Sequence, residues 1–320
     1  GKMRAAIVGL GVIGRVHAEV LRAQGETLCA VCDTDTEKLK DFSAAGYTDY
    51  LRLLDEERPD VVHVCTPHYL HADMVTEALK RNINVLCEKP LCISEKDIPR
   101  ILEAEKHSAA RLGVCHQNRY NAANAFVKEY LKDKQVRGAY ATVAWRRDAA
   151  YYASGDWRGR RATEGGGVLI NQALHTLDLL QWLVGEPEYV AANVSNLTLS
   201  DVIEVEDTAA AIFSGGAEFS LFATVGSAAD FPVSVVLRTD AETITLLPDT
   251  VLINVKIKEF QRDGRAYGKG CYGTGHEKLI ADFYDCMRTG RHFMLDGAEG
   301  AKVVKLILAA YASGGKRIKI

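Results

Sequence analysis

Residues 7–14 read IVGLGVIG, and this stretch decides the fold that the sequence predicts. It places Gly9, Gly11 and Gly14 in a GxGxxG register, directly after an apolar run and at the start of an amphipathic segment. Glycines at these positions permit a tight turn and let the backbone approach a pyrophosphate at a helix amino terminus, where free N–H groups attract anions. The glycine pattern alone is weak evidence for dinucleotide binding. Its place between a strand and a helix is, however, the one that a dinucleotide-binding turn requires.

Asp33 ends the second apolar run, where dinucleotide-binding domains carry an acidic residue. A carboxylate there accepts hydrogen bonds from the ribose hydroxyls of NAD and repels the 2′-phosphate of NADP. The sequence therefore predicts NAD as the cofactor. An alternative stays open, in which the glycines only close a turn and Asp33, before Thr34 and Asp35, only caps a helix.

The segments around this stretch alternate short apolar runs with amphipathic stretches up to about residue 120, which is typical of a parallel, doubly wound α/β sheet. We expect strands at residues 4–9, 27–33, 61–65, 84–88 and 112–116. We expect helices near residues 14–24, 35–44, 70–81 and 95–108.

Beyond residue 122 the pattern becomes that of an α+β domain with a large, mostly antiparallel sheet. We expect strands near residues 138–147, 188–197, 206–214, 217–226, 232–238, 242–247 and 251–258. We expect helices near residues 122–132, 168–184, 276–289 and 298–312. The sequence thus predicts an NAD-binding Rossmann domain over residues 1–121 and a substrate-binding and oligomerisation domain over residues 122–320, whose closing helices could pack back on the first domain.

The composition excludes several classes of partner. Of the 320 residues, 48% are hydrophobic and 25% charged, and the net charge of −3 gives no field that would gather nucleic acid or an anionic membrane. No apolar run is long enough to span a membrane, and no signal-peptide pattern precedes the first strand, so we expect a cytoplasmic protein with a small-molecule partner. The eight cysteines are scattered and form one CxxC without a second pair, so we expect no bound metal.

Three further segments carry a family resemblance. They are CTPHYLHADM at residues 65–74, CEKPL at 87–91 and EGGGVLINQALHTLDLLQWLVG at 164–185. Together with GLGVIG they resemble the Gfo/Idh/MocA family over essentially the whole chain. The resemblance implies an NAD-dependent dehydrogenase of class EC 1.1.1.- that acts on a sugar or a cyclitol.

The cofactor site is expected at the carboxyl edge of the parallel sheet, where open α/β folds bind ligands. Thr66-Pro67-His68 ends the third strand there, and Lys89 leaves the fourth, held extended by Pro90. The resemblance implies that Lys89 is catalytic, because a cation beside the nicotinamide stabilises a developing alkoxide; the alternatives are a plain turn and an unspecialised surface lysine. The expected cofactor-binding residues are Gly9, Gly11, Val12, Ile13, Gly14, Asp33, Thr34, Thr66, Pro67, His68, His71, Glu88, Lys89 and Gln117.

In the segment 168–184, Asn171, His175 and Asp178 have the i, i+4, i+7 spacing that puts side chains on one face of a helix. A buried polar stripe of this kind is either hydrogen-bonded or functional. The resemblance implies that His175 is the catalytic general base, a task that suits imidazole, and the alternative is a core histidine. Many family members carry aspartate where this chain has Asn171, and since an amide cannot carry a proton, we expect Asn171 to orient the substrate.

The loop at residues 146–161 brings aromatic rings and arginines that suit the apolar face and hydroxyl edges of a sugar. Arg119 and Tyr120 could either position the substrate or brace the domain junction, and Tyr272 is a minor candidate. The expected substrate-binding residues are Arg119, Tyr120, Trp157, Arg158, Asn171, His175 and Tyr272.

Three functions stay open at this point: a dehydrogenase, an NAD-retaining glycosidase or epimerase-like enzyme that oxidises its sugar transiently, and a non-catalytic dinucleotide-binding regulator. Intact Lys89 and His175 argue against the regulator. We also expect a homodimer or homotetramer, because a sheet covered by helices on one face needs cover on the other. Apolar positions alternate along it, for example Ala217, Phe219, Leu221 and Ala223.

Overall fold

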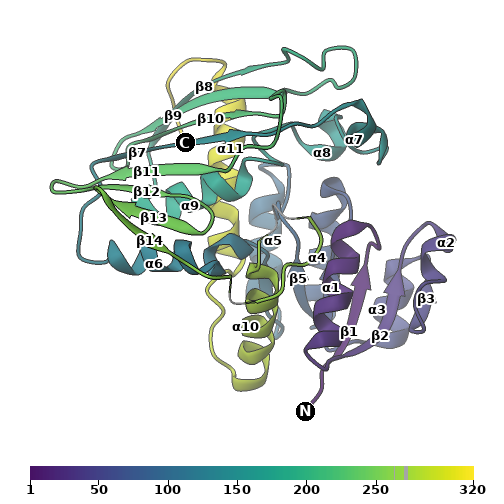
Figure 1. Cartoon of the computed structure of the whole chain (residues 1–320). Helices are drawn as coiled ribbons and strands as arrows, with labels where there is room; N and C mark the ends of the chain where they lie inside the picture. The colour runs from purple at the N-terminus through teal and green to yellow at the C-terminus, as the bar shows by residue number, and fades with distance from the viewer. Residues whose placement is uncertain (263, 270–272) are drawn as a thin grey trace. The chain divides into compact units, whose positions relative to one another are not determined.

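The computed structural model describes residues 1–262, 264–269 and 273–320 (Figure 1). The chain forms two compact units, the first made of Gly1–Gln117 with Gly264–Ala301 and the second of Asn118–Asp263 with Lys302–Ile320. The first unit therefore includes a segment from far along the chain. The functional division expected after residue 121 stays a prediction.

The first unit holds a parallel sheet that, among the described residues, has six strands in the order β3-β2-β1-β4-β5-β6. The strands are β1 Arg4–Val8, β2 Thr27–Cys32, β3 Ala45–Tyr47, β4 Val61–Val64, β5 Asn84–Cys87 and β6 Leu112–Val114. The predicted doubly wound sheet is confirmed. The chain reverses its direction of winding between β1 and β4, which is the point where such sheets bind ligands.

The helices of this sheet depart from the prediction in two places. The segment expected at 35–44 is only a single short turn, and the helix over Tyr50–Glu57 was missed because only Leu53 and Leu54 on it are buried. The helices are α1 Val12–Ala23, α2 Thr36–Leu39, α3 Tyr50–Glu57, the 3₁₀ turn η1 His68–Leu70, α4 His71–Lys80 and α5 Asp97–Lys106.

The segment that returns to the first unit packs on the edge strand β6. Phe283 of α10 (Gly275–Thr289) and Phe293 are both buried, and their rings meet edge to face with centroids 5.0 Å apart. Gly113 of β6 lies under both rings, so a Cβ there would be 2.7 Å from Phe283 and 2.9 Å from Phe293. The backbone N–H of Val114 also donates to the carbonyl of Leu295 at 2.9 Å.

The second unit holds the predicted antiparallel sheet, which has nine strands among the described residues, in the order β14-β13-β12-β11-β7-β10-β9-β8-β15. Only the central pair of β7 and β10 is parallel. The run expected at 251–258 is two strands, because Asn254 adopts a left-handed φ of 54° and turns the chain. The strands are β7 Gly138–Ala144, β8 Tyr189–Ser195, β9 Thr208–Ser214, β10 Phe219–Thr224, β11 Ser234–Arg238, β12 Thr243–Leu246, β13 Thr250–Ile253, β14 Lys256–Glu259 and β15 Ile318–Lys319.

The two faces of this sheet differ in cover. Helix α9 (Leu174–Val184) packs against β7 and β10 on one face. The residues expected to form an oligomer surface are buried, so that choice was wrong; they are Ala217, Phe219, Leu221 and Ala223. Side chains alternate between the two faces of a strand, so Ser220 and Phe222 of β10 point to the opposite face. Large apolar side chains are exposed on that face: Tyr140 of β7 by 55%, Ile212 of β9 by 62% and Phe222 by 47%.

The helix expected at 168–184 begins only at Leu174, so Asn171 is not on it and the one-face argument for Asn171 was wrong. The backbone N–H groups of Gly167 and Leu169 donate to the buried carboxylate of Glu206, at 2.8 and 3.1 Å. Glu206 thus caps the turns before α9. Within these turns the backbone N–H of Ala173 donates to the carbonyl of Val168, five residues back, at 2.8 Å, which departs from the i−4 pattern of an α-helix.

The other helices are α6 Ala122–Tyr130, α7 Ala149–Ala153, α8 Arg161–Glu164 and α11 Gly297–Ser313. Within the described part of the chain, no helix combines the length and the apolar character needed to cross a membrane.

Gly113→Ala tests whether the returning segment belongs to the fold of the first unit. We expect the added methyl group to push against the rings of Phe283 and Phe293 and to cost about 1–3 kcal/mol of unfolding free energy. Gly138→Ala is the matched control, because no atom lies within 4 Å of the Cβ that it adds to β7. Thermal unfolding measures both variants, and equal melting temperatures would contradict the packing described.

Candidate cofactor and substrate site

Two of the three motif glycines allow close packing, and the third leaves open space. Gly9 has a φ of +95°, and a Cβ on it would lie 2.5 Å from the carbonyl oxygen of Cys65. A Cβ on Gly14 would lie 1.9 Å from the carbonyl oxygen of Gly9. Gly11, the N-cap of α1, has no atom within 4 Å of its Cβ position. The open cradle at the amino terminus of α1 fits the pyrophosphate of a dinucleotide.

Asp33 is fixed beside this loop. Its Oδ2 accepts a hydrogen bond from the backbone N–H of Leu10 at 2.9 Å, and its Oδ1 accepts one from that of Asp35 at 2.9 Å. The N-cap of α2 is Asp35, whose side chain accepts from Glu37, so the alternative in which Asp33 caps the helix is wrong. Contact with a ribose stays a prediction for this carboxylate.

His71 links the two loops that follow β4 and β5. Its ring is 1% exposed, with Nε2 at 2.8 Å from the carbonyl oxygen of Thr66 and Nδ1 at 2.6 Å from that of Pro90. Both partners are acceptors, so a neutral ring donates one hydrogen bond and an imidazolium donates two. The pKa of His71 is lowered by burial. The hydrogen bonds to the two carbonyls raise this pKa but do not outweigh burial. Only the imidazolium form hydrogen-bonds to both loops, and the neutral ring hydrogen-bonds to one of them.

Lys89 lies between two anchored residues. On one side, the backbone N–H of Glu88 donates to the carbonyl of Val64 at 2.9 Å, and its carboxylate Oε2 lies 2.7 Å from Nε2 of His17. On the other side, Pro90, which follows a cis peptide bond, contacts His71. Lys89 itself is half-buried. The chain is therefore held immediately before and after the lysine.

The Glu88 carboxylate is 5% exposed and ionised. Burial opposes its charge, but hydrogen bonds from His17 and from His276, whose Nε2 is 3.3 Å away, hold the pKa of Glu88 well below its usual range. Its carboxylate thus faces protein groups, and a direct contact with the cofactor stays a prediction.

The remaining residues expected at the cofactor differ in exposure. Val12, at the first turn of α1, is 53% exposed, and Thr34 is exposed. Ile13 and Pro67 are half-buried, whereas His68 and Gln117 are 5% and 2% exposed.

In the second unit, Tyr151 is the centre of a polar cluster. Its Oη accepts hydrogen bonds from Arg158 at 2.7 Å, from Gln172 at 3.3 Å and from Asn171 at 3.4 Å. Asn171 also donates to Oε2 of Glu164 at 2.7 Å. The structure therefore brings together Arg158 and Asn171, two of the expected substrate residues, and adds Tyr151 and Glu164 as their partners.

Arg119 forms a buried ion pair with Asp178. Its Nε and Nη2 donate to the two carboxylate oxygens at 2.9 and 2.8 Å, and its guanidinium lies 5.1 Å from the centre of the Trp182 ring. Arg119 and Asp178 are 2% and 1% exposed. These contacts of Arg119 lie within the second unit, so both roles expected for Arg119 stay predictions. His175 is half-buried in the first turn of α9, and Tyr120 is half-buried in the 3₁₀ turn η2, Gln117–Tyr120.

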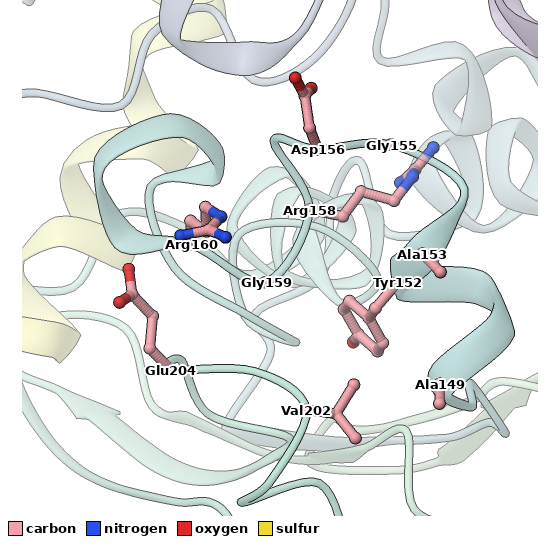
Figure 2. A pocket seen from close by; sticks show the side chains of 10 residues that line it. All are labelled: Ala149, Tyr152, Ala153, Gly155, Asp156, Arg158, Gly159, Arg160, Val202 and Glu204. Atoms are coloured by element: carbon pink, nitrogen blue, oxygen red, sulfur yellow. The ribbon is translucent and has the colours of Figure 1, made fainter.

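Arg158 also lines a cavity of about 440 Å³, between α7 and the loop that carries Glu204 (Figure 2). Arg160 and Asp156 also line it, and the ring of Tyr152 forms part of its wall. Burial raises the pKa of Tyr152, which keeps its phenol protonated. Trp157 stacks on Arg158 with 4.5 Å between guanidinium and ring centre. Tyr272 lies outside the described residues.

Comparisons with known proteins show the family of this chain. A family model described as an oxidoreductase family with an NAD-binding Rossmann fold matches residues 3–116, and the GFO/IDH/MocA C-terminal domain matches residues 134–244. The chain belongs to the GFO/IDH/MocA oxidoreductase family. Its first unit is accordingly an NAD-binding Rossmann domain, and the cofactor predicted from Asp33 is confirmed.

Two curated relatives are inositol dehydrogenases. Inositol 2-dehydrogenase of Rubrobacter xylanophilus is 30% identical over 58% of this chain and 53% of its own length. Myo-inositol 2-dehydrogenase of Thermotoga maritima is 26% identical over 66% of this chain and 64% of its own. The chain thus spans between about half and two thirds of the length of these relatives.

Solved structures match the chain over its whole length. The WlbA dehydrogenase from Bordetella pertussis, in complex with NADH and UDP-GlcNAcA, is 28% identical with a TM-score of 0.87 and covers 100% of this chain and 99% of its own. Levoglucosan dehydrogenase in complex with NADH and levoglucosan has the same TM-score and the same coverage at 19% identity, which shows the shared fold alone.

Several groups at these sites could not be found from the sequence. His17 and Glu206 act through partners that lie 71 and 39 positions away in the chain. Glu164 lies in the recognised segment 164–185, seven positions before its partner Asn171, but its residue type alone did not single it out. The one available signal for His17 was its place on the buried face of the helix that follows the glycine motif.

Gly11→Ala tests the open cradle. The residue has a φ of −74°, which alanine also adopts, so we expect normal stability. The added methyl group occupies the space into which the pyrophosphate would fit, and we expect NAD affinity to fall at least about tenfold, or ~1.4 kcal/mol. Gly14→Ala is the contrasting variant, since its Cβ would meet the backbone of Gly9 and lower stability. Calorimetric titration with NAD decides, and unchanged affinity in Gly11→Ala would place the cofactor elsewhere.

Proposed function

We propose that the protein is an NAD-dependent dehydrogenase that oxidises a secondary alcohol of a sugar, a cyclitol or a glycoside. The observation that carries this proposal is Lys89, which leaves β5 at the carboxyl edge of an NAD-binding sheet and is anchored on both sides. Membership of an oxidoreductase family supports the redox chemistry. The inositol dehydrogenases and the UDP-sugar-bound WlbA, all more than 25% identical, support a polyhydroxylated substrate.

In this proposal NAD, when bound, takes up the hydride from the carbinol carbon. The Lys89 ammonium group donates a hydrogen bond to the carbinol oxygen and stabilises the charge that develops there. His175 accepts the hydroxyl proton as general base, for which imidazole is suited near neutral pH.

The second unit would hold the sugar. The amide nitrogen of Asn171 is held by Glu164, which fixes the direction of its side chain. An amide carries no proton in this chemistry, so Asn171 orients a hydroxyl and does not relay a proton. Arg158, stacked between Tyr151 and Trp157, would supply further hydrogen bonds beside an aromatic surface.

Lys89→Met and His175→Ala test the catalytic assignment. We expect each variant to lower turnover roughly a hundredfold or more while NAD affinity changes little, because both groups act on one oxygen during the reaction. The double variant should lose less than the product of the single effects, since the two groups work as a unit. A panel of sugars, cyclitols, glycosides and uronates with NAD, scored for NADH and for non-redox products, supplies the measurement.

Asn171→Asp is the control for this series, because it introduces the commoner family residue. It also replaces the amide donor to Glu164 with a second carboxyl group, so we expect activity to be retained with an altered pH profile. Near-normal turnover of His175→Ala would mean that His175 is a core residue. Product formation without NADH would point to the NAD-retaining alternative, and NAD binding with neither outcome to a regulator.

We also propose a cytoplasmic homodimer or homotetramer assembled on the open face of the second sheet. Tyr140 and Ile212 lie on that face on either side of Ser220, and Phe222 lies there between Thr142 and Ala210. Exposed apolar side chains grouped on one sheet face favour contact with a second copy. The described cysteines are free thiols and nearly all buried, which suits a reducing compartment.

Phe222→Lys tests this face. We expect the lysine to place a charge in the contact and to shift the protein towards a monomer, measured by light scattering at micromolar concentration. Val255→Lys is the matched control, because Val255 is 90% exposed but sits in the β13–β14 turn, off the face. An unmodified protein that scatters as a monomer would end the proposal.

A further inference from the structure

A row of buried polar groups extends from Glu88 through the interior of the first unit. Nε2 of His17 lies 2.7 Å from Glu88 Oε2, Nδ1 of His17 lies 2.8 Å from Nδ1 of His63, and Nε2 of His63 lies 2.6 Å from the hydroxyl of Tyr284. Both histidines are fully buried, and Tyr284 is 1% exposed. The four residues come from α1, β4, α10 and the end of β5, and no recognised motif of the family resemblance contains His17, His63 or Tyr284.

The contacts fix how protons are arranged along this row. Burial, and then the neighbouring His17, hold the pKa of His63 well below its usual value, so His63 is neutral. Burial raises the pKa of Tyr284 well above its usual value, so its phenol keeps its proton. Because the Glu88 carboxylate only accepts, Nε2 of His17 donates to it.

When the His17 ring carries one proton, each group in the row has a hydrogen-bond partner, and all the hydrogen bonds run from Tyr284 towards Glu88. Tyr284 donates to His63, His63 donates through Nδ1 to His17, and His17 donates through Nε2 to Glu88. A second proton on His17 reverses the first two hydrogen bonds and leaves the third unchanged. The donor to Glu88 is therefore the same in both states, and a charge-assisted hydrogen bond of this kind is strong in a dry interior.

A bound metal ion is the alternative to a hydrogen bond between His17 and Glu88. Ligand atoms of His17, Glu88 and Cys115 all lie within 4.8 Å of one another, as a metal site would require. Two ligands of a tetrahedral zinc site, each about 2.1 Å from the metal, lie roughly 3.4 Å apart. The 2.7 Å between His17 and Glu88 is shorter and has the length of a hydrogen bond. The distance thus favours a shared proton over a shared metal.

We propose that His17 is a positioning residue for the reaction: backed by His63 and Tyr284, it holds the Glu88 carboxylate and so fixes the backbone from which Lys89 extends. Glu88 and Lys89 are adjacent, so a shift of the Glu88 anchor moves the root of the lysine side chain. The kinetic consequence rests on the proposed dehydrogenase function, whereas the ordering of Lys89 does not.

The test uses two substitutions of similar size. In His17→Gln the side-chain amide can still donate to Glu88, whereas in His17→Met the donor is lost but the length is kept. We expect kcat of His17→Met to fall at least about tenfold with KM and NAD affinity changed less than about threefold, and His17→Gln to recover to within about threefold of the unmodified protein. Equal rates for the two variants, slow or fast, would overturn the proposal.

A second readout needs no substrate. Lysines labelled by reductive ¹³C-methylation give NMR signals, and the signal of Lys89 is the one that Lys89→Met lacks. We expect a single sharp Lys89 signal in the labelled protein without substitutions and in His17→Gln, and a broadened or doubled one in His17→Met. If no alcohol is oxidised, the proposed function fails, and this signal still decides the role of His17.

If His17→Met does not fold, as judged by thermal unfolding, Tyr284→Phe replaces it. That variant removes one oxygen and leaves Nε2 of His63 without its partner. We expect a smaller effect in the same direction, with kcat lowered about fivefold and a broader Lys89 signal. No change in either quantity would overturn the proposal.

Discussion

The organisation of the cofactor-binding unit depends on how closely the turn at Gly9–Gly14 approaches the end of β4. No side chain fits between Gly9 and the backbone at Cys65, or between Gly14 and the carbonyl of Gly9. This contact sets the amino terminus of α1 at the point where the winding of the sheet reverses, which is where its N–H groups can meet an anion. It also sets the direction of α1, and so brings His17 into the interior beside the end of β5.

The sequence predicted the strands of the parallel sheet to within a residue or two where they are buried on both faces, as in β1 and β4, because such strands are continuous apolar runs. It missed β3, which has three residues and none of them buried. It placed the start of α9 too early because an apolar pattern cannot show that the backbone N–H of Ala173 donates five residues back, to Val168, before the regular helix begins. Alternation along β10 showed that the sheet has two faces, but it could not show which one the helices cover.

The candidate site was predictable to a similar degree. Gly11, Asp33 and Lys89 follow from motifs, because each lies at a strand end whose chemistry is local. The groups that hold them were not predictable. His17 lies 71 positions from Glu88, and Tyr284 lies 221 positions from His63, so only the fold makes them neighbours. The ion pair of Arg119 with Asp178 was equally hidden, because the two residues lie 59 positions apart in the chain.

Two buried carboxylates show how the identity of the donors decides the charge. Burial disfavours ionisation at both Glu88 and Glu206. The imidazole donors of Glu88 outweigh burial and lower its pKa. The donors of Glu206, which are the phenol of Tyr311 at 2.7 Å and backbone N–H groups, do not outweigh burial, and the pKa of Glu206 is raised. Their effects on stability therefore have opposite signs. The contribution of Glu88 is present above the carboxyl pKa of the unfolded chain, about 4.3, and is lost as pH falls through its lower folded value. The protonated form of Glu206 stabilises the fold below about pH 4.3, and this contribution is lost as pH rises through the higher pKa of Glu206 in the folded protein. On acidification Glu206 takes up its proton first, at the turns before α9, while the carboxylate that anchors the Lys89 segment keeps its charge to a lower pH.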